Sequence, residues 1–120
     1  MKYDWIDAYL LAKVGVSKNL KKEWNWIRYV IEDKLFVAIC LNDDNEPYYI
    51  TLKLPPDEGI RLREIYEDII PGYYMNKTHW NSIKVDGDIS DELMEDMLDQ
   101  AYQVVLSSFS KKRQLEILDK

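Results

Sequence analysis

The sequence predicts an α+β domain in which helices pack against an antiparallel sheet. Three features indicate this fold: strand-like segments gather within residues 26–54, short turns join them, and segments with helical periodicity flank them. Strands joined by such short connections pair antiparallel. The expected element order is α-β-β-β-α-β-α, with the helices against the sheet. A chain of 120 residues predicts a single domain, residues 1–120.

The first helix is expected over residues 4–13. Asp4 can accept hydrogen bonds from the free amide groups of its first turn. Gly15 suits the left-handed conformation in which many helices end. Residues 16–25 are polar and basic, and this composition predicts a connection outside the core.

Three strands are expected next, over residues 26–31, 35–41 and 48–54. The second is apolar on both faces, which is typical of a central strand. Residues 42–45, Asn-Asp-Asp-Asn, favour a turn because these side chains bond to their own backbone. The third strand alternates, and one of its faces carries Tyr49, Thr51 and Lys53.

The second half of the chain predicts helix, strand and helix. Residues 55–58 suit a helix start, since proline and acids are favoured in a first turn. Residues 80–85 form the fourth predicted strand. A long helix with an apolar stripe is expected from about Ser90 to Phe109, and residues 110–120 extend it or fray.

Composition and charge limit the classes of function. The chain is 47% hydrophobic and 32% charged, and no apolar run approaches the roughly 20 residues that cross a bilayer. It has no recognisable signal-peptide cleavage site, and Cys40 is its single cysteine. We therefore expect a cytoplasmic protein without membrane association.

The net charge of −6 opposes a chain-wide affinity for nucleic acid. However, residues 8–22, 71–85 and 106–115 contain no acid and hold nine of the sixteen lysines and arginines. A domain can be acidic overall and still present one basic face.

Unusual side chains concentrate in residues 71–92, which contain the single histidine, His79. No second histidine and no acid lie close to it in the loop, so neither a zinc site nor a general base is expected. Two readings of His79 stay open. It stabilises the loop through a hydrogen bond to backbone, or it contacts an anionic ligand.

The neighbours of His79 also leave alternatives open. Asn76, Lys77 and Thr78 could bind phosphate. Alternatively, Asn76 holds the turn and Lys77 is a solvated side chain. Trp80 offers a surface on which bases stack, or it covers the core. The same alternatives apply to Tyr73 and Tyr74. Strand alternation places Trp80, Ser82 and Lys84 on one face, and Asn81, Ile83 and Val85 on the other.

Several chemical motifs are absent. Residues 86–92 suggest a calcium loop, but Asp91 and Met97 stand where the loop glycine and the terminal glutamate are needed. The scattered glycines exclude a phosphate-binding loop, and no serine lies in a nucleophile elbow. We expect no metal, no cofactor and no catalytic residue, and so not an enzyme.

Residues 70–82, Ile-Pro-Gly-Tyr-Tyr-Met-Asn-Lys-Thr-His-Trp-Asn-Ser, closely resemble the signature of the MmcQ/YjbR family of small bacterial proteins. Residues 86–93 resemble the turn and final helix that follow it in that family, and the resemblance covers nearly the whole chain. It implies a YjbR-like two-layer fold similar to that of type III secretion chaperones. The family is generally labelled DNA-binding, which is an analogy of fold rather than a mechanism.

The chain departs from the family pattern at two places. Tyr74 stands where relatives often carry a histidine, so a two-histidine site is not carried over. Residues 22–26, Lys-Glu-Trp-Asn-Trp, replace a Phe-Pro-Gly-like segment. Any role that this segment has in relatives is therefore not assigned to this chain.

The resulting expectation is a small nucleic-acid-binding domain, with DNA as the ligand that the family label implies. The alternative is a protein-interaction or chaperone-like module that docks a partner on its sheet face or final helix. A monomer is expected. Convergence of Lys18, Lys21, Lys22, Lys77 and Lys84 on one face would favour the nucleic-acid hypothesis, and their scatter would count against it. The candidate contact residues are Asn76, Lys77, His79, Trp80, Asn81, Lys84, Lys21, Lys22 and Arg28.

Overall fold

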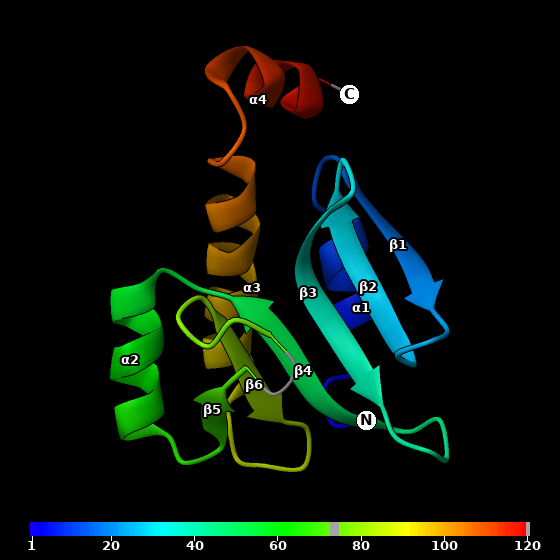
Figure 1. The fold of residues 1–120 in the computed structure, drawn as a ribbon, viewed down its shortest axis with the longest axis vertical. Helices are drawn as coiled ribbons and strands as arrows, with labels where there is room; N and C mark the ends of the chain where they lie inside the picture. The colour runs from blue at the N-terminus through cyan, green and yellow to red at the C-terminus, as the bar shows by residue number, and fades with distance from the viewer. Residues whose placement is uncertain (73–74, 120) are drawn as a thin grey trace.

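The computed structural model describes residues 1–72 and 75–119, and it contains six strands and four helices (Figure 1). The predicted α+β class is confirmed, with more elements than the sequence indicated. In chain order the elements are α1 (Ile6–Leu11), β1 (Val16–Lys21), β2 (Trp26–Ile31), β3 (Lys34–Leu41), β4 (Pro47–Lys53), α2 (Pro56–Ile65), β5 (Ile69–Pro71), β6 (Trp80–Lys84), α3 (Asp91–Leu106) and α4 (Lys111–Leu118).

The six strands form one sheet in the order β1-β2-β3-β4-β6-β5, and every neighbouring pair is antiparallel. Tight turns connect the first four strands. Glu32 and Asp33 both have positive φ, 49° and 71°, as the favoured two-residue hairpin turn requires. In the next turn the side-chain oxygen of Asn42 accepts hydrogen bonds from the backbone N–H groups of Asp44 and Glu46. The predicted Asn-Asp turn is therefore confirmed.

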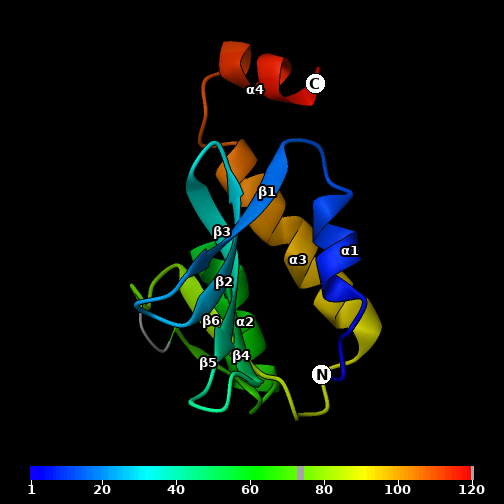
Figure 2. The same cartoon turned by 90° about the vertical axis from the view of Figure 1, so that its right-hand side faces the viewer.

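Helices cover one face of this sheet. Helices α1 and α3 lie on the same side of the strands (Figure 2), and α2 lies over the β5–β6 end, where Gly59 approaches Asn81. A row of five isoleucines crosses the sheet beneath the helices, because the strand register places them directly opposite one another. Four of the five belong to the buried core together with apolar side chains of α3, and the fifth, Ile27, is partly buried against this core. The row consists of Ile27, Ile39, Ile50, Ile83 and Ile69.

The opposite face of the sheet, which we call the open face, is covered by no helix within the described residues. Its centre carries small side chains that bond to one another across the strands. The Cys40 thiol lies 3.6 Å from the Thr51 hydroxyl, which lies 2.9 Å from the Ser82 hydroxyl. Met75, from the connection between β5 and β6, packs onto this face beside Trp26.

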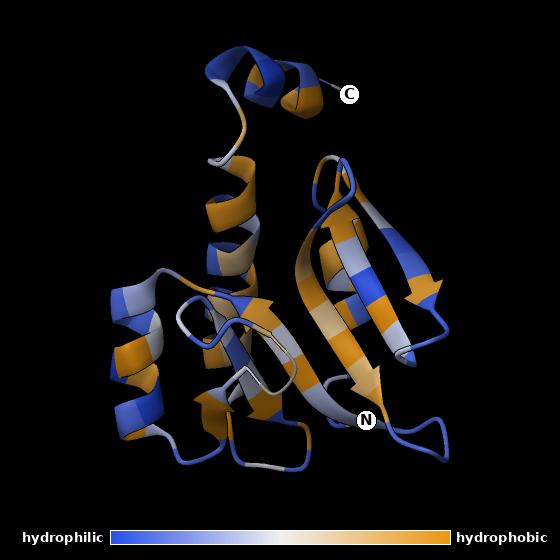
Figure 3. Ribbon diagram, in the orientation of Figure 1, coloured by the Kyte–Doolittle hydropathy of each residue, from blue (hydrophilic) through white to orange (hydrophobic). Residues whose placement is uncertain are grey.

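Strand β1 corrects the prediction that residues 16–25 form a connection. All six of its residues pair with β2, from Val16 opposite Ile31 to Lys21 opposite Trp26. It is the edge strand, with mostly exposed side chains. This explains its polar sequence, which contrasts with that of β3 (Figure 3). The three-residue strand β5 was also not predicted.

The ends of two helices differ from the prediction. Helix α1 begins at Ile6, and no side chain caps it, so the expected Asp4 cap is wrong. The last long helix ends at Leu106 rather than Phe109. Beyond it the chain starts a separate helix, α4, where the Ser110 hydroxyl accepts a hydrogen bond from the Arg113 backbone N–H.

Helix α4 packs back onto the domain. Ile117 is fully buried, and a β-carbon added to Gly15 would lie 2.6 Å from the Ile117 Cγ2 atom. Gly15 has φ 83°, but it lies in the turn before β1 rather than at the end of α1, whose C-cap is the right-handed Ala12, so its predicted role as the helix exit is wrong. Arg113 forms an ion pair with Glu32 of the β2–β3 turn at 2.6 Å. None of the helices in the described part of the chain is long and apolar enough to cross a membrane.

Candidate nucleic-acid interface on the open face

A row of five residues crosses the open face from the edge strand β1 to β6. Each residue lies directly opposite the next on the neighbouring strand. With strands about 4.8 Å apart, the row spans about 19 Å. It places a lysine at each end and aromatic rings between them. The row consists of Lys21, Trp26, Cys40, Tyr49 and Lys84.

Two further cations project from the same face. Arg28 lies between Asn19 and Ala38 in the neighbouring row, and Lys53 lies opposite Trp80 in the row beyond. None of the strand residues that the register assigns to this face is acidic. The overall negative charge of the chain therefore lies elsewhere, and the open face is locally positive.

The guanidinium of Arg28 is half-buried but makes few hydrogen bonds. Its Nη1 donates to Asn19 Oδ1 at 3.4 Å, a long hydrogen bond. Its Nε is buried and has no hydrogen-bond partner among the described residues. The partly exposed end of the guanidinium has further donors, which suit an anionic ligand.

Four of the nine residues predicted from the sequence lie together on the open face: Lys21, Arg28, Trp80 and Lys84. Lys22 is exposed in the turn that follows β1. Trp80 is only 9% exposed, with Lys53 Nζ 6.0 Å from its ring centroid. The reading of Trp80 as a core residue thus fits better than the reading as an exposed stacking surface.

Asn76 holds the turn before β6. Its Oδ1 accepts from the Thr78 backbone N–H at 2.8 Å, and its carbonyl accepts from the Trp80 N–H at 3.0 Å. Lys77 is exposed, and its carbonyl accepts a hydrogen bond from Arg63 Nη1 at 3.1 Å. These bonds support the structural reading of Asn76 and leave the Lys77 ammonium at the surface.

His79 and Asn81 join this turn to the rest of the protein. The His79 carbonyl accepts from the Leu54 N–H at 2.9 Å and from Asn81 Nδ2 at 3.4 Å. Asn81 is fully buried on the helix-covered face, and its Oδ1 accepts from Arg63 Nη1 at 2.9 Å. A direct contact of Asn81 with a ligand is therefore excluded in this conformation, and its role is structural.

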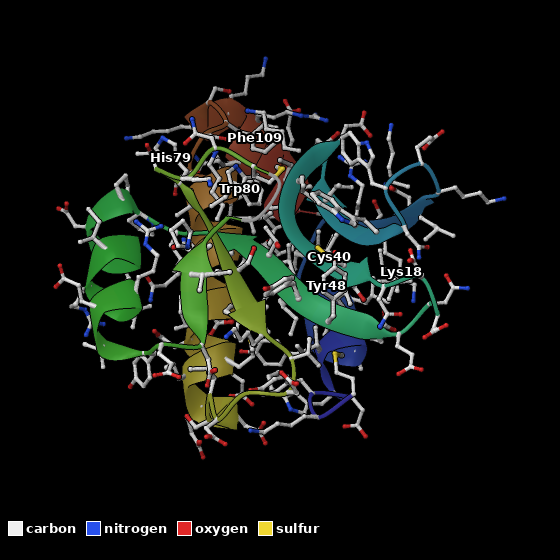
Figure 4. All side chains as sticks on the ribbon, turned by 60° about the horizontal axis from the view of Figure 1, so that its bottom comes forward. Lys18, Cys40, Tyr48, His79, Trp80 and Phe109 are labelled. Atoms are coloured by element: carbon white, nitrogen blue, oxygen red, sulfur yellow. The ribbon has the colours of Figure 1, made fainter. Side chains whose placement is uncertain are left out.

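The lysines named above converge only in part. Lys18 lies on the helix-covered side of β1, opposite Tyr29, and pairs with Asp7 of α1 at 2.8 Å. Figure 4 labels Lys18 on the edge strand, far along the sheet order from His79 and Trp80. Lys21 and Lys84 share the open face, whereas the exposed Lys77 lies in the β5–β6 connection near Arg63 of α2. Lys18 is therefore left out of the candidate interface.

Sequence reasoning missed the aromatic residues that border the open face at the β1–β2 turn. Trp24 is 54% exposed, and its ring centroid lies 5.2 Å from that of the buried Trp26. Together with Glu23 and Met75 these rings line a pocket of about 450 Å³. The closely spaced tryptophans were visible in the sequence, but the tight turn that carries Trp24 was not.

Lys53 was also missed as a site residue, although strand alternation had already assigned it to one face with Tyr49 and Thr51. The contribution of Lys53 to the candidate interface depends on β6, which places Trp80 directly opposite it. The sequence spacing of these two residues gives no signal for that pairing.

The described residues offer little for catalysis by metal or thiol. Across residues 1–72 and 75–119, no group of three histidine, cysteine, aspartate or glutamate side chains is placed to hold a metal ion. Burial raises the pKa of the Cys40 thiol to about 11, and the thiol is not exposed. A buried, protonated thiol is a poor nucleophile.

The fold places the chain among small α+β proteins with a six-stranded antiparallel sheet, and in this chain the face without helices carries cations and aromatic rings. The chain belongs to the YjbR family, whose model matches residues 11–104. It is 28% identical over 105 residues to the Escherichia coli K12 protein YjbR, covering 88% of this chain and 87% of that protein. It is 32% identical over 102 residues to YyaQ of Bacillus subtilis, covering 85% and 81%. Both relatives are named as uncharacterised proteins.

Solved structures share the fold. A crystal structure of a Deinococcus radiodurans protein with a DUF419 domain superposes with a TM-score of 0.84 at 22% identity, covering 95% of this chain and 86% of that one. A Pseudomonas syringae protein superposes with a TM-score of 0.69 at 20% identity, covering 87% and 98%. These similarities establish the architecture and carry no statement about ligands.

Proposed function

We propose that the protein binds single-stranded nucleic acid across the open face of its sheet. The observation that carries this proposal is the sharing of one acid-free strand surface by Lys21, Arg28, Lys53 and Lys84. Ammonium and guanidinium groups on one face follow a phosphate backbone, and bordering aromatic rings stack unpaired bases.

A single strand fits this surface better than a duplex does. Duplex readers insert a helix or a β-ribbon into a groove, whereas the open face is a broad sheet with no helix over it within the described residues. Its exposed ring, Trp24, lies at the border next to Lys21, whose Nζ is 5.0 Å from the ring centroid. Alternating rings and cations are typical of surfaces that bind single strands.

The test measures anisotropy of fluorescein-labelled DNA and RNA strands of about 12 nucleotides, starting at about 50 mM salt. We expect binding that weakens steeply as salt increases. Lys53→Glu and Lys84→Glu should each weaken binding and reduce the slope of log affinity against log salt by about 0.7, the value for one lost contact to a single strand.

Lys112→Glu is the matched control. Lys112 is exposed on α4 and its replacement changes the net charge by the same amount, so its effect reports charge alone. No binding of either strand at about 50 mM salt would refute the proposal, because phosphate contacts are strong under that condition. Equal effects of Lys84→Glu and Lys112→Glu would also refute it.

The alternative function, docking of a protein partner, is better supported at α4 than at α3. Most of the apolar stripe of α3 is buried against the sheet, so that helix cannot dock a partner through it. Helix α4 instead exposes Leu115 and Leu118, which are 70% and 48% accessible. Exposed leucines on a short helix favour a protein contact. The test is sedimentation of the wild-type chain against Leu115→Ser, and a monomer unaffected by the change would count against self-association through α4.

A further inference from the structure

The pocket beside the open face has an aromatic wall. Its lining among the described residues is Glu23, Trp24, Trp26 and Met75, and its volume is about 450 Å³. The two indole rings meet at 66°. One ring is buried and the other is half exposed, so the pocket offers a flat apolar surface that opens to solvent.

The turn that carries Trp24 is fixed before any ligand arrives. Asn25 adopts a positive φ of 55°, and its Nδ2 donates to the Asn42 carbonyl and to Asn45 Oδ1, both at 3.0 Å. Its carbonyl accepts from the Leu41 N–H at 3.0 Å. These bonds connect the β1–β2 turn to the β3–β4 turn. A wall that is already ordered costs less entropy on binding.

The charge around the pocket selects the type of ligand. Lys21 lies over the Trp24 ring, Lys22 is exposed in the same turn, and Arg28 follows Trp26 on the same face. These three cations outweigh the carboxylate of Glu23 in the lining and so disfavour a cationic guest, although aromatic walls alone would attract one. They favour instead a flat, neutral group attached to an anion.

We infer that this pocket receives a single nucleobase of the bound strand, stacked on Trp24, with its phosphate toward Lys21 and Lys22. The inference deepens the proposed function and rests on it. Glu23, the acidic residue in the pocket lining, is an acceptor for an exocyclic amino group. The pocket therefore prefers adenine or cytosine, which carry that donor, over thymine, which lacks an amino group.

The experiment compares homopolymer DNA strands of about 12 nucleotides made of adenine, cytosine, thymine or abasic units. Adenine and cytosine strands should bind more tightly than thymine strands, and abasic strands should bind weakest. Trp24→Ala should lower the affinity for the adenine strand about 10-fold and leave the abasic strand unaffected, because stacking on one ring is lost. Trp24→Phe should restore most of the loss.

Glu23→Gln should reduce the preference for adenine and cytosine over thymine, since a carboxylate accepts these bonds more strongly than an amide. Glu64→Gln is the matched control, because Glu64 is exposed on α2 at the other end of the sheet. Equal binding of adenine and abasic strands, or equal effects of Trp24→Ala on both, overturns the base pocket while leaving a phosphate-binding surface intact.

An uncharged probe separates the pocket from the strand-binding surface. Adenosine, titrated at millimolar concentration with the indole resonances followed by NMR, should shift the Trp24 signals in the wild type. If no strand binds and adenosine still shifts them, the proposed function fails and the base pocket is supported. If tetramethylammonium shifts these signals and adenosine does not, the pocket is a cation site and the inference is overturned.

Discussion

Arg63 of α2 donates a hydrogen bond to the buried side chain of Asn81 on β6 at 2.9 Å, and a second to the carbonyl of Lys77 at 3.1 Å. One guanidinium thus holds two parts of the segment that carries the family signature. Gly59 of the same helix lies against Asn81, where a β-carbon would be 3.0 Å from Oδ1. Part of the signature is therefore explained by packing and hydrogen bonding rather than by ligand contact.

Replacing Asn81 by alanine should lower the free energy of unfolding by about 1–3 kcal/mol, because the change removes the buried hydrogen bonds of Asn81 with the Arg63 guanidinium and the His79 carbonyl. Urea denaturation followed by tryptophan fluorescence measures the change. Arg61→Ala is the control, since Arg61 is exposed and pairs with the neighbouring Glu58, and surface pairs contribute about 1 kcal/mol or less. Equal effects of the two variants would contradict the structural role of Asn81.

Replacing Gly15 by alanine should destabilise the protein by about 1–3 kcal/mol, because alanine is strained at φ 83° and its methyl group would collide with Ile117. A double-mutant cycle with Ile117→Ala separates the two causes. If the collision contributes, Gly15→Ala costs less in the Ile117→Ala background. If it costs the same in both backgrounds, backbone strain accounts for the whole effect.

The acid dependence of stability should include a contribution from Asp7. Hydrogen bonds from Lys18 and Tyr29 lower the pKa of this carboxyl in the folded protein. The unfolded chain then holds the proton more tightly, so the stabilisation is present above the unfolded pKa and disappears as pH falls through the folded value. Asp7→Asn should be less stable near neutral pH and should lose less stability on acidification.

The measurement for Asp7 is the free energy of unfolding from neutral pH to about pH 2. Asp43→Asn is the control because Asp43 is exposed in the β3–β4 turn. An Asp7→Asn profile parallel to that of the wild type would show that the Lys18 and Tyr29 contacts do not form in solution.

Cys40 should resist thiol reagents in the folded protein. Its side chain is buried, and the pKa of its thiol is raised to about 11, so reaction requires transient opening of the sheet. Labelling at about pH 8 should be at least about 100-fold slower in buffer than in denaturant. Labelling in buffer at the rate of the denatured chain would show that Cys40 is accessible to solvent and not buried in the sheet.

The sequence predicted the elements that have strong local patterns. Apolar strands such as β3 and the Asn42 turn form where their own residues favour them. The edge strand β1 has no such pattern, because its exposed side chains tolerate polar residues on both faces, and only its pairing with β2 defines it. The Ser110 cap of α4 was available as a local signal and would have separated that helix from α3.

The site was harder to predict than the fold. Strand alternation grouped Trp80 with Lys84 correctly, but it could not indicate how far Trp80 is buried. Nor could it indicate that Arg63, eighteen residues away in the chain, removes Asn81 from the candidate interface. Burial and strand order are set by tertiary packing, and a single sequence gives no measure of them.

Because helices cover one face of the sheet, neighbouring residues of the same strand are under different constraints. Residues that alternate toward the helices, such as Ile50 and Leu52, are fully buried and constrained by volume. Their neighbours Tyr49 and Lys53 project to the opposite side and are only partly buried. Substitutions there change what the surface contacts without repacking the interior. Positions on that side are thus freer to change than the buried ones while the architecture stays constant, and the solved structures at about 20% identity keep the same fold.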